Sequence, residues 1–373
     1  MPIASSLLKK PRLVKKLKDF YSYVQKNDGK VGTKTRGIDL NFNNACNLRC
    51  KYCFTNSPKG DHVKDFLDYD AIAKLADEAD ELGYFEFDLQ GGELLLQPKK
   101  LFKVLEAIRP ERFYMYLTTN GYYLDESMAN RLAEANVSRV SVSIDSMDEK
   151  IHDEIRGRKD SWRRAMEGLK HVQKAGMDPY LNITVGHYNA HTDHLKQLLD
   201  YSKDQKYKTL LNVAVPSGMW QNAVDIICDD NDREYLRKMR KEYKNLVRNI
   251  WNPFDKNHEK ILGCTTVNRI YVTPIGDVLV CPYVHIKIGN IFEKPLKEII
   301  NRGFSIKYFR EHSDLCLAGE DTSFISNFMT KSGQSIFKPA IPEEIFDKSE
   351  ITKGDYINKL SVNDRQVQRK TKF

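Results

Sequence analysis

The stretch that decides the fold is residues 38–53, IDLNFNNACNLRCKYC, in which a strand pattern leads directly into a cluster of cysteines. Residues 38–43 alternate apolar and polar side chains, as a β-strand does. Cys46, Cys50 and Cys53 follow within eight residues. A loop with these spacings folds back on itself, so it can bring three sulfurs into one small volume. Three thiolates can hold a cubane iron–sulfur cluster and leave one of its four irons open to a small molecule.

A zinc site is the alternative for these cysteines. Zinc needs a fourth tetrahedral ligand, often a second Cys-x2-Cys pair or a histidine. The nearest histidine is His62, and its spacing is not one that zinc sites use. In a reducing compartment, clustered cysteines bind metal or do chemistry more often than they form disulfides.

The chain after this loop alternates strand and helix patterns. The predicted strands are residues 38–43, 84–89, 113–117, 137–144, 180–185 and 209–215. Helical periodicity lies between them, at residues 72–82, 126–135, 162–176 and 195–199. This alternation predicts an α/β fold with a parallel sheet and right-handed crossovers. Periodicity alone leaves open whether the sheet is doubly wound or a partial barrel.

Polar motifs follow the predicted strands at the point where each strand ends. They are Gly91-Gly92-Glu93 after the second strand, Asn120 after the third, Ser143 and Asp145 at the end of the fourth, and Arg156 in the following loop. Parallel α/β sheets and barrels place their active sites at these carboxyl ends. Individually, these residues are also explained as turns, helix caps or surface ion pairs.

The cysteine loop, with the aromatic residue Tyr52 before its last cysteine, and the Gly-Gly-Glu motif together resemble the radical S-adenosylmethionine (radical SAM) superfamily. The resemblance runs from residue 38 to about residue 215. It implies a partial (β/α)6 barrel and a [4Fe-4S] cluster on Cys46, Cys50 and Cys53. It also implies that the reduced cluster splits SAM into methionine and a 5′-deoxyadenosyl radical, which takes a hydrogen atom from the substrate.

The resemblance further implies which residues contact SAM: Tyr52, Gly91, Gly92, Glu93, Asn120, Ser143, Asp145 and Arg156. The glycines let the backbone approach a ligand closely, and the Glu93 carboxylate suits the amino group of SAM. An arginine fork suits its carboxylate. The candidates for a substrate base or clamp are Asp88, His187, Asn189, Asn212, Tyr283 and His285.

A second, smaller α+β module follows the barrel. Residues 229–251 have a charged helical pattern, residues 270–272 and 278–280 flank a turn at 274–277 and predict a β-hairpin, and residues 296–300 predict a short helix. Cys264, Cys281 and Cys316 surround this hairpin, and the pattern is similar to the SPASM and shorter "twitch" modules of radical SAM enzymes, which hold auxiliary iron–sulfur clusters.

The full SPASM pattern has seven cysteines and two clusters, so three cysteines exclude a two-cluster module. One auxiliary [4Fe-4S] cluster is predicted, with an open iron or with Glu320 or Asp321 as fourth ligand. The alternative is that the module has kept its fold and lost its cluster. Cys228 is expected to be a structural thiol.

We expect the chain to divide into a basic N-terminal extension (1–37), the radical SAM core (38–220), a helical linker (221–258), the auxiliary module (259–330) and a partly disordered tail (331–373). The net charge of +8 is concentrated at the two ends, where solubilising tails are the expectation. No apolar run is long enough to span a membrane and no secretory signal is present, so a cytoplasmic location is expected.

Fold and cofactor do not specify the substrate. Peptide-modifying relatives often carry an additional N-terminal domain, and the 37 residues before the first strand are too few for one. A small sugar-, cyclitol- or nucleoside-like metabolite is therefore favoured over a peptide or protein. A flavodoxin or ferredoxin is the expected electron donor. The rival from another class is a non-catalytic nucleic-acid-binding or scaffold protein, but no nucleic-acid motif supports it, so no specific nucleic acid is expected.

Overall fold

The computed structural model describes residues 10–57, 67–329 and 335–360, and its centre is a curved parallel sheet. The first six strands are β1 (Gly37–Asn41), β2 (Glu86–Gln90), β3 (Tyr114–Thr119), β4 (Arg139–Ser143), β5 (Asp178–Val185) and β6 (Lys208–Val213). They neighbour one another in chain order and all pair in parallel. A doubly wound sheet would reverse its strand order, so this order confirms the partial (β/α)6 barrel.

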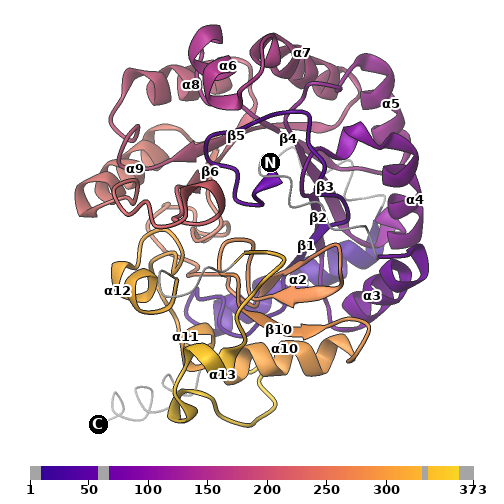
Figure 1. Cartoon of the computed structure of the whole chain (residues 1–373), viewed down its shortest axis with the longest axis vertical. Helices are drawn as coiled ribbons and strands as arrows, with labels where there is room; N and C mark the ends of the chain where they lie inside the picture. Colours follow the sequence, from indigo (N-terminus) through magenta and orange to yellow (C-terminus); the bar gives the residue numbers. More distant parts are fainter. Residues whose placement is uncertain (1–9, 58–66, 330–334, 361–373) are drawn as a thin grey trace.

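Helices surround the barrel on its outside (Figure 1). They are α3 (Tyr69–Glu81), α4 (Pro98–Ile108), α5 (Glu126–Glu134), α6 (Glu149–Arg156), α7 (Ser161–Lys174) and α8 (Asp193–Asp204). Three of them begin at an aspartate, Asp68, Asp125 or Asp148, whose side chain accepts hydrogen bonds from the first-turn amides. Their apolar faces pack on the outer face of the sheet and form the main core.

The inner face of the barrel is polar. Ile38 and Leu40 of β1 are fully buried in the core between sheet and helices, whereas Asp39 between them faces a cavity inside the barrel. In the strand register Asp39 aligns with Asp88, then Tyr116, then Arg139. One layer of polar side chains therefore crosses four strands, and the barrel encloses a polar cavity instead of a filled apolar core.

The predicted β-hairpin is confirmed, and it extends the barrel sheet. It consists of β8 (Arg269–Val272) and β9 (Asp277–Leu279), which are antiparallel, and β10 (Lys287–Asn290) continues the pattern. β8 pairs in parallel with β1, so all ten strands form one sheet. The helix α10 (Leu296–Ser305) is longer than the short helix expected at residues 296–300.

The prediction of a long helix over residues 229–251 is wrong after residue 242. Helix α9 (Asp230–Glu242) ends there, and β7 (Leu246–Val247) follows and pairs with the edge of β6. Tyr243 is buried and donates a hydrogen bond of 2.6 Å to Asp200, which turns the chain towards the sheet. The local helical preference of this segment is overridden by two tertiary effects. β7 pairs with the open edge of β6, and Tyr243 and Leu246 become buried.

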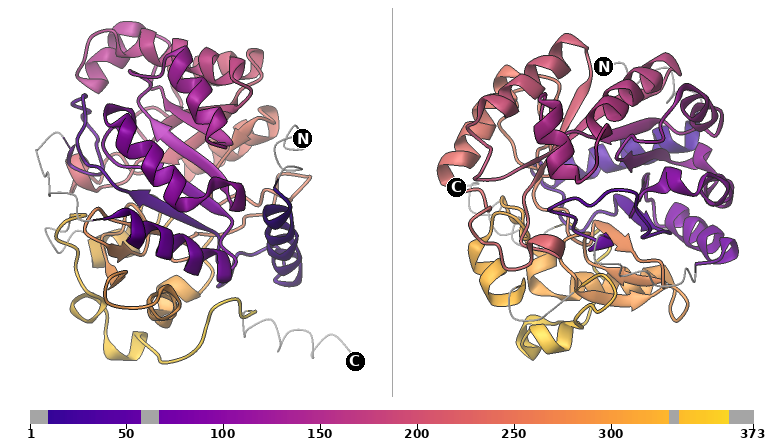
Figure 2. Two further views of the ribbon diagram at one scale, coloured as in Figure 1. Left: turned by 90° about the vertical axis from the view of Figure 1, so that its right-hand side faces the viewer. Right: turned by 45° about the horizontal axis from the view of Figure 1, so that its top comes forward.

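The basic N-terminal extension contains a helix, α2 (Pro11–Lys26), in place of a solvated tail. Its buried side chains Leu13, Phe20 and Val24 form a second apolar cluster, which includes Phe85 and Leu262 from the body of the protein. In the left view of Figure 2, α2 stands at one end of the barrel, apart from the helices that cover its outside. Much of the expected charged tail is therefore an integral part of the fold.

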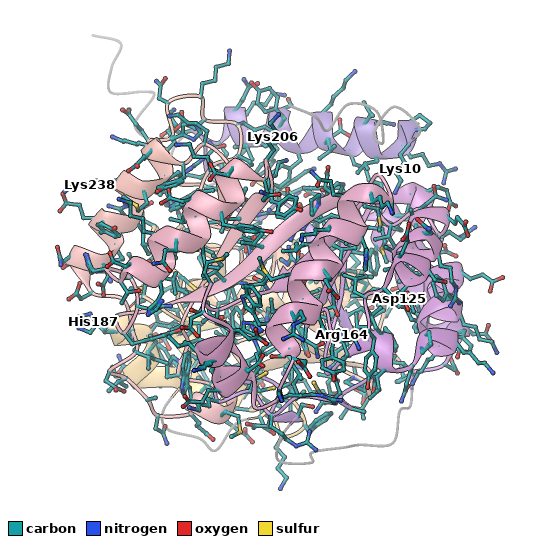
Figure 3. The ribbon with its side chains drawn as sticks, turned by 90° about the horizontal axis from the view of Figure 1, so that it is seen from above. Lys10, Asp125, Arg164, His187, Lys206 and Lys238 are labelled. Carbon is teal, nitrogen blue, oxygen red and sulfur yellow. The ribbon has the colours of Figure 1, made fainter. Side chains whose placement is uncertain are left out.

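Lys10, directly before α2, is only 5% exposed. Its ammonium nitrogen lies 3.0 Å from each of four acceptors, three carbonyl oxygens and one hydroxyl near the amino ends of β3 and β4, which share its three N–H groups (Figure 3). Burial lowers the pKa of Lys10 to about 8, against the opposing effect of Glu111. This lysine anchors α2 to the barrel, which corrects the expectation that the first basic cluster is only a solubilising surface.

Residues 335–360, part of the tail expected to be partly disordered, fold against the body. They contain α13 (Pro342–Ile345), and isolated bridges join Ala340 to Ile286 and Ile351 to Ile306. The other parts of that tail, 331–334 and 361–373, lie outside the described residues. The remaining short elements are α11 (Lys307–Arg310), α12 (Thr322–Phe324), η2 (Leu94–Leu96), η3 (Pro110–Arg112), η4 (Gly218–Trp220), η5 (Ile325–Met329) and η6 (Lys348–Glu350).

Among the helices of the described residues, none combines the length and apolarity that crossing a membrane requires.

Candidate active site

A cavity of about 240 Å³ opens inside the barrel and contains both predicted cysteine sets in its wall. The lining sulfurs are those of Cys46, Cys50, Cys53, Cys264, Cys281 and Cys316. The first set comes from the loop after β1, and the second comes from the segments around the β8–β9 hairpin and after α11. The structure thus brings residues 270 positions apart in the sequence to one cavity, because β8 pairs with β1.

Neighbouring loops fix the backbone of the first cysteine loop. The Arg49 amide donates to the carbonyl of Arg156 at 2.9 Å, and the Lys51 amide donates to Ile155 at 3.1 Å. On the other side the Met219 amide donates to the carbonyl of Cys53 at 2.9 Å. The end of α6 and the segment after β6 therefore hold this loop from two directions, which positions the sulfurs before any ligand binds.

Gly91 and Gly92 line the cavity, where they can let a ligand approach the backbone closely. They also allow two loops to pack against each other. A Cβ atom on Gly92 would lie 2.2 Å from the carbonyl oxygen of Ala45, and one on Gly91 would lie 2.3 Å from the side-chain oxygen of Asn41. The loop after β2 is thus pressed directly against the cysteine loop. Only glycine fits at these two positions without moving one of the two loops.

The Glu93 carboxylate points into the protein and is not part of the cavity wall. It accepts hydrogen bonds from the Thr119 hydroxyl at 2.7 Å and from the amides of Asn120 and Leu95 at 2.8 and 2.9 Å. Burial raises the pKa of Glu93, and these three donors oppose that rise. The sequence-based expectation was an ammonium contact from this carboxylate. In the structure the carboxylate instead fixes the end of β3, where Asn120 faces the cavity.

Tyr52, Asp145 and Arg156 form a buried group beside Cys50. The Asp145 carboxylate accepts hydrogen bonds from the Tyr52 hydroxyl and, through both oxygens, from the Arg156 guanidinium, with the Nε contact at 2.6 Å. Arg156 Nη1 lies 3.7 Å from Cys50 Sγ. Tyr52, Arg156 and Ser143 line the cavity, whereas Asp145 does not. Asp145 was expected to face the ligand; here it neutralises Arg156, which limits the freedom of Arg156 to bind a ligand carboxylate.

Asn120 completes the wall near the first cysteine. Its side-chain amide lies 4.0 Å from Cys46 Sγ and donates to the side chain of Asn47 at 2.9 Å. Across the cavity, Trp220 lies with its ring centroid 5.0 Å from that of Tyr52. Sequence reasoning missed Trp220, because its position on η4 depends on how the segment after β6 folds back onto Cys53.

The first cysteine set has the electrostatic character of a cluster site. Burial raises the pKa of Cys46 to about 12 and also raises the pKa of Cys50, where Arg156 opposes the rise. The Leu48 amide points at Cys46 Sγ at 3.5 Å. Buried thiols of this kind become thiolates when a metal compensates their charge. Three sulfurs in one cavity wall, with an amide and a guanidinium close to two of them, fit a three-cysteine cluster.

The second cysteine set fits a cluster on the same grounds. The Val284 amide donates to Cys281 Sγ at 3.2 Å, and the Thr266 hydroxyl lies 3.0 Å from Cys264 Sγ. A hydrogen bond between the thiols of Cys264 and Cys316 lowers the pKa of Cys264 to about 6 and raises that of Cys316. Two sulfurs in contact, next to a third in the same wall, match the donor set of an iron–sulfur cluster.

The two carboxylates considered as a fourth ligand are occupied elsewhere. Glu320 is buried and accepts hydrogen bonds from Arg248 and from the amide of Cys316, the latter at 2.8 Å. Asp321 caps the start of α12 through the amide of Phe324. Neither lines the cavity, so the second set offers three protein ligands from this wall. Cys228 is buried in the core outside the cavity.

The floor of the cavity is built from the polar layer of the barrel. Arg269 pairs with Asp39 through two nitrogens, and its Nη2 lies 3.3 Å from Asp88. Asp88 also accepts a hydrogen bond of 3.3 Å from the Thr118 hydroxyl. Burial, and after it the neighbouring Asp39, raise the pKa of Asp88 well above its usual value. Three substrate candidates, Asp88, Asn212 and Tyr283, line this cavity.

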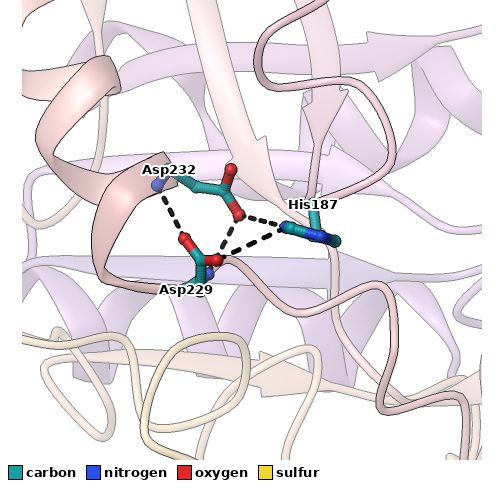
Figure 4. A group of neighbouring side chains, drawn as sticks. All are labelled: His187, Asp229 and Asp232. Carbon is teal, nitrogen blue, oxygen red and sulfur yellow. Dashed lines mark hydrogen bonds and ion pairs between the residues drawn. The ribbon is translucent and has the colours of Figure 1, made fainter.

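The other three substrate candidates, His187, Asn189 and His285, do not line the cavity. His187 Nδ1 lies 2.9 Å from the buried Asp232 and 3.7 Å from Asp229 at the start of α9, and it is exposed at the rim (Figures 3 and 4). Asn189 bonds to the amide of Gly186 and closes a local turn after β5. These residues follow predicted strand ends, but the local turns direct their side chains away from the barrel axis.

Several lining residues were missed from the sequence. They are the interior residues Asp39, Tyr116, Thr118, Arg139, Asn182 and Arg269. The signal was present in the alternation of each strand, since a polar residue every second position in a buried strand indicates a polar interior. The alternation that predicts each strand therefore also indicates which of its residues face inwards.

The comparisons with known proteins agree with this geometry. Residues 40–202 match the radical SAM superfamily, and residues 264–318 match SPASM, an iron-sulfur cluster-binding domain. The first match runs from the end of β1 through β5, and the second begins at Cys264 and includes Cys281 and Cys316.

Two curated relatives are named for their activities. The chain is 24% identical over 302 residues to an AdoMet-dependent heme synthase of Methanosarcina barkeri, covering 72% of this chain and 83% of that protein. It is 35% identical over 151 residues to a GTP 3',8-cyclase of Microcystis aeruginosa, covering 38% of this chain and 44% of the cyclase. The second match therefore spans less than half of the length of that relative.

The fold is also found in a solved structure. Streptococcus suis SuiB, determined with S-adenosylmethionine and with the precursor peptide SuiA, superposes with a TM-score of 0.56 at 16% identity, covering 75% of this chain and 68% of SuiB. At this identity the similarity concerns the fold alone. It supports the partial barrel.

Proposed function

Because this chain belongs to the radical SAM superfamily and carries an iron–sulfur SPASM domain, we propose that it oxidises or rearranges a small polar metabolite held between two [4Fe-4S] clusters. We assign the SAM-binding cluster to Cys46, Cys50 and Cys53. We assign one auxiliary cluster to Cys264, Cys281 and Cys316. The observation that carries the proposal is that all six cysteines line one cavity.

When bound, the first cluster and SAM supply a 5′-deoxyadenosyl radical that takes a hydrogen atom from the substrate. The protein's own part is placement and shielding. Asn120, Ser143 and Arg156 face the cavity near the first cysteines, where SAM would lie. Asp145 orients Arg156 from behind, so Asp145 is a positioning residue. The buried floor excludes water from the radical.

The polar interior of the barrel supports a small substrate rich in hydroxyl groups. Asn182 and Asn212 lie next to each other in the cavity wall, and Thr118 and Asp88 lie on the floor. Such amide, hydroxyl and carboxyl groups suit the hydroxyls of a sugar, cyclitol or nucleoside. The two curated relatives are named for reactions on small molecules, heme synthesis and GTP cyclisation.

A peptide substrate remains the second candidate, because SuiB was solved with its precursor peptide. The similarity to SuiB concerns the fold alone. The charged and hydrogen-bonding groups of the cavity floor belong to this chain itself, and they favour the small polar metabolite. The chain is an enzyme, so the idea of a non-catalytic nucleic-acid-binding or scaffold protein is withdrawn. A flavodoxin or ferredoxin is the proposed electron donor.

Iron and sulfide counting after anaerobic reconstitution tests the assignment of the six cysteines. The wild type should hold about eight irons, and each of two triple alanine variants, one for each cysteine set, should hold about four. With SAM and dithionite, 5′-deoxyadenosine should form in the wild type. It should not form in the variant that lacks Cys46, Cys50 and Cys53.

Two controls make the result decisive. A Cys228→Ala variant should keep the full iron content, because Cys228 lies in the core outside the cavity. Four irons in the wild type, unchanged in the variant that lacks Cys264, Cys281 and Cys316, would overturn the auxiliary cluster. Absence of 5′-deoxyadenosine from the fully loaded wild type would overturn the proposed chemistry.

A further inference from the structure

Arg139 lies inside the barrel, in the polar layer that forms the cavity floor. It is the first residue of β4, and its register partners are Tyr116 on β3 and Asp178 on β5. It is 8% exposed and is part of the cavity wall. A charged guanidinium is costly to bury in this way unless an opposite charge or several hydrogen bonds compensate it.

Two aromatic rings from the neighbouring strands contact this guanidinium. Its central carbon lies 4.0 Å from the ring centroid of Tyr116 on β3 and 4.0 Å from that of Tyr180 on β5. Arg139 Nε donates a hydrogen bond of 3.0 Å to the Ser141 hydroxyl. The two rings and this hydrogen bond hold the side chain in place, and only the terminal nitrogens remain available for a further hydrogen bond.

The charge of Arg139 has no direct partner. Across residues 10–57, 67–329 and 335–360, no carboxylate lies within 4.0 Å of its nitrogens, and its terminal nitrogens donate to no protein acceptor. Its neighbour on the floor is the contrast, because Arg269 is paired with Asp39, Glu86 and Asp88. The acidic groups of the floor thus contact Arg269 directly, and Asp88 attracts the charge of Arg139 only from a longer distance. The terminal nitrogens of Arg139 have no hydrogen-bond partner among the described residues, and the side chain lines the cavity.

We propose that Arg139 is the binding residue for an anionic group of the substrate, a carboxylate or a phosphate. A planar fork with two free terminal nitrogens matches the two oxygens of such a group. The rings of Tyr116 and Tyr180 restrict the movement of the fork, so little freedom is lost on binding. This inference rests on the proposed function and narrows it, since the substrate becomes a small polar metabolite that carries an oxyanion.

The position of Arg139 separates this site from the SAM site. Arg139 opens β4 at its amino end, whereas Ser143 closes the same strand at the carboxyl end, next to the first cysteine loop. The two residues are four steps apart along an extended strand, which is roughly 13 Å at 3.3 Å per step. The substrate anion would therefore bind at the floor, with the rest of the molecule directed towards the clusters.

Isothermal titration of the reconstituted protein with simple anions tests the inference. The probes are inorganic phosphate, succinate and, as a neutral comparison, myo-inositol. Phosphate or succinate should bind saturably to the wild type, and the stronger of the two identifies the type of oxyanion. Arg139→Met should weaken that binding at least about tenfold, as expected for loss of charge-assisted hydrogen bonds. Arg163→Met, on the exposed side of α7, is the control and should bind as the wild type does.

Arg139→Lys keeps the charge without the planar fork, and it remains informative if the methionine variant does not fold. It should also bind the anion more weakly than the wild type, because a single ammonium cannot make the two parallel bonds. Equal affinity in the wild type and both Arg139 variants, or no saturable binding of either anion to the wild type, would overturn the inference.

Saturating SAM separates this inference from the proposed function. SAM should leave anion binding to the wild type unchanged; competition would mean that Arg139 holds the carboxylate of SAM, and the inference would be lost. 5′-Deoxyadenosine formation, measured on the same wild-type sample, reports on the proposed function alone. Anion binding without SAM cleavage would overturn the proposed function and leave the anion site standing.

Discussion

The backbone N–H of Gly92 donates a hydrogen bond of 2.8 Å to the carbonyl of Asn43, and this bond fastens the loop after β2 to the cysteine loop after β1. The adjoining amide of Glu93 donates to the carbonyl of Ala45 at the same distance. The Gly-Gly-Glu motif is therefore a brace for the first cysteines as well as part of the cavity wall.

Gly92→Ala should displace the cysteine loop, because the added methyl group would lie 2.2 Å from the Ala45 carbonyl oxygen. We expect a loss of stability of at least about 1–3 kcal/mol, as for overpacking at a rigid contact, and a marked fall in iron bound per chain. Urea unfolding and iron counting measure the two effects. Gly176→Ala is the control, since its φ of 78° brings backbone strain without any atom within 4 Å. Equal iron content in both variants would contradict the bracing role.

Asp145→Asn should destabilise the protein by roughly 3–5 kcal/mol, because it leaves the buried guanidinium of Arg156 without its counter-charge. Urea unfolding measures the change. Glu154→Gln is the matched control from the same part of the chain, since Glu154 forms an exposed ion pair with Lys51. That control should unfold as the wild type does. A loss in Asp145→Asn no larger than in the control would mean that Arg156 finds another partner.

His187 should titrate above its ordinary pKa, because Asp232 accepts a hydrogen bond from the charged ring and attracts its charge. A raised pKa in the folded state means that the contact stabilises the fold fully below the unfolded pKa of about 6.5 and that this contribution disappears as the pH rises through the folded value. NMR titration of the His187 ring measures the pKa. In Asp232→Asn it should fall towards the ordinary value, and an identical titration in both proteins would refute the pairing.

Lys10 should make the protein more stable at alkaline pH. Burial lowers its pKa in the folded state to about 8, so the unfolded chain holds a proton that the folded chain has released. Stability should therefore rise with pH, by roughly 2 kcal/mol between pH 8 and 10. The measurement is the difference in urea unfolding between wild type and Lys10→Met at the two pH values, which removes the contribution of other groups. A difference that does not change with pH would show that Lys10 stays charged.

The features of this protein that depend on local sequence patterns were predictable from the sequence. The spacing of Cys46, Cys50 and Cys53 predicted a shared site, and these three cysteines line one cavity. Alternating strands and helices predicted the parallel sheet. The helix α2 was missed although its pattern was present: Leu13, Leu17, Phe20 and Val24 recur at helical spacing. The lysines around these residues favoured the prediction of a solvated tail. The segment is instead an amphipathic helix whose apolar side is buried.

The directions of individual side chains were not predictable, because they depend on tertiary contacts. The Glu93 carboxylate is turned inwards by three donors, two of which come from the end of β3. Asp145 is turned towards Arg156 and Tyr52 in the same way. Arg139 is identified only once the register of β3, β4 and β5 places it between two tyrosine rings. The sequence predicts which residues lie at the end of each strand. Contacts with the neighbouring strands determine which of their side chains face the cavity.

The pairing of β8 with β1 determines how this enzyme can be taken apart and rebuilt. Truncation before Arg269 would leave those N–H and C=O groups of residues 37–40 that face β8 without partners, and such an exposed strand edge favours aggregation. A chimera that exchanges the SPASM region must therefore also supply a strand that pairs with β1 in the register of Ile38 with Ile270. Exchange of this region between relatives therefore replaces a strand of the barrel sheet. A chimera designed as a simple fusion of two domains would not restore this pairing, and we expect it not to fold.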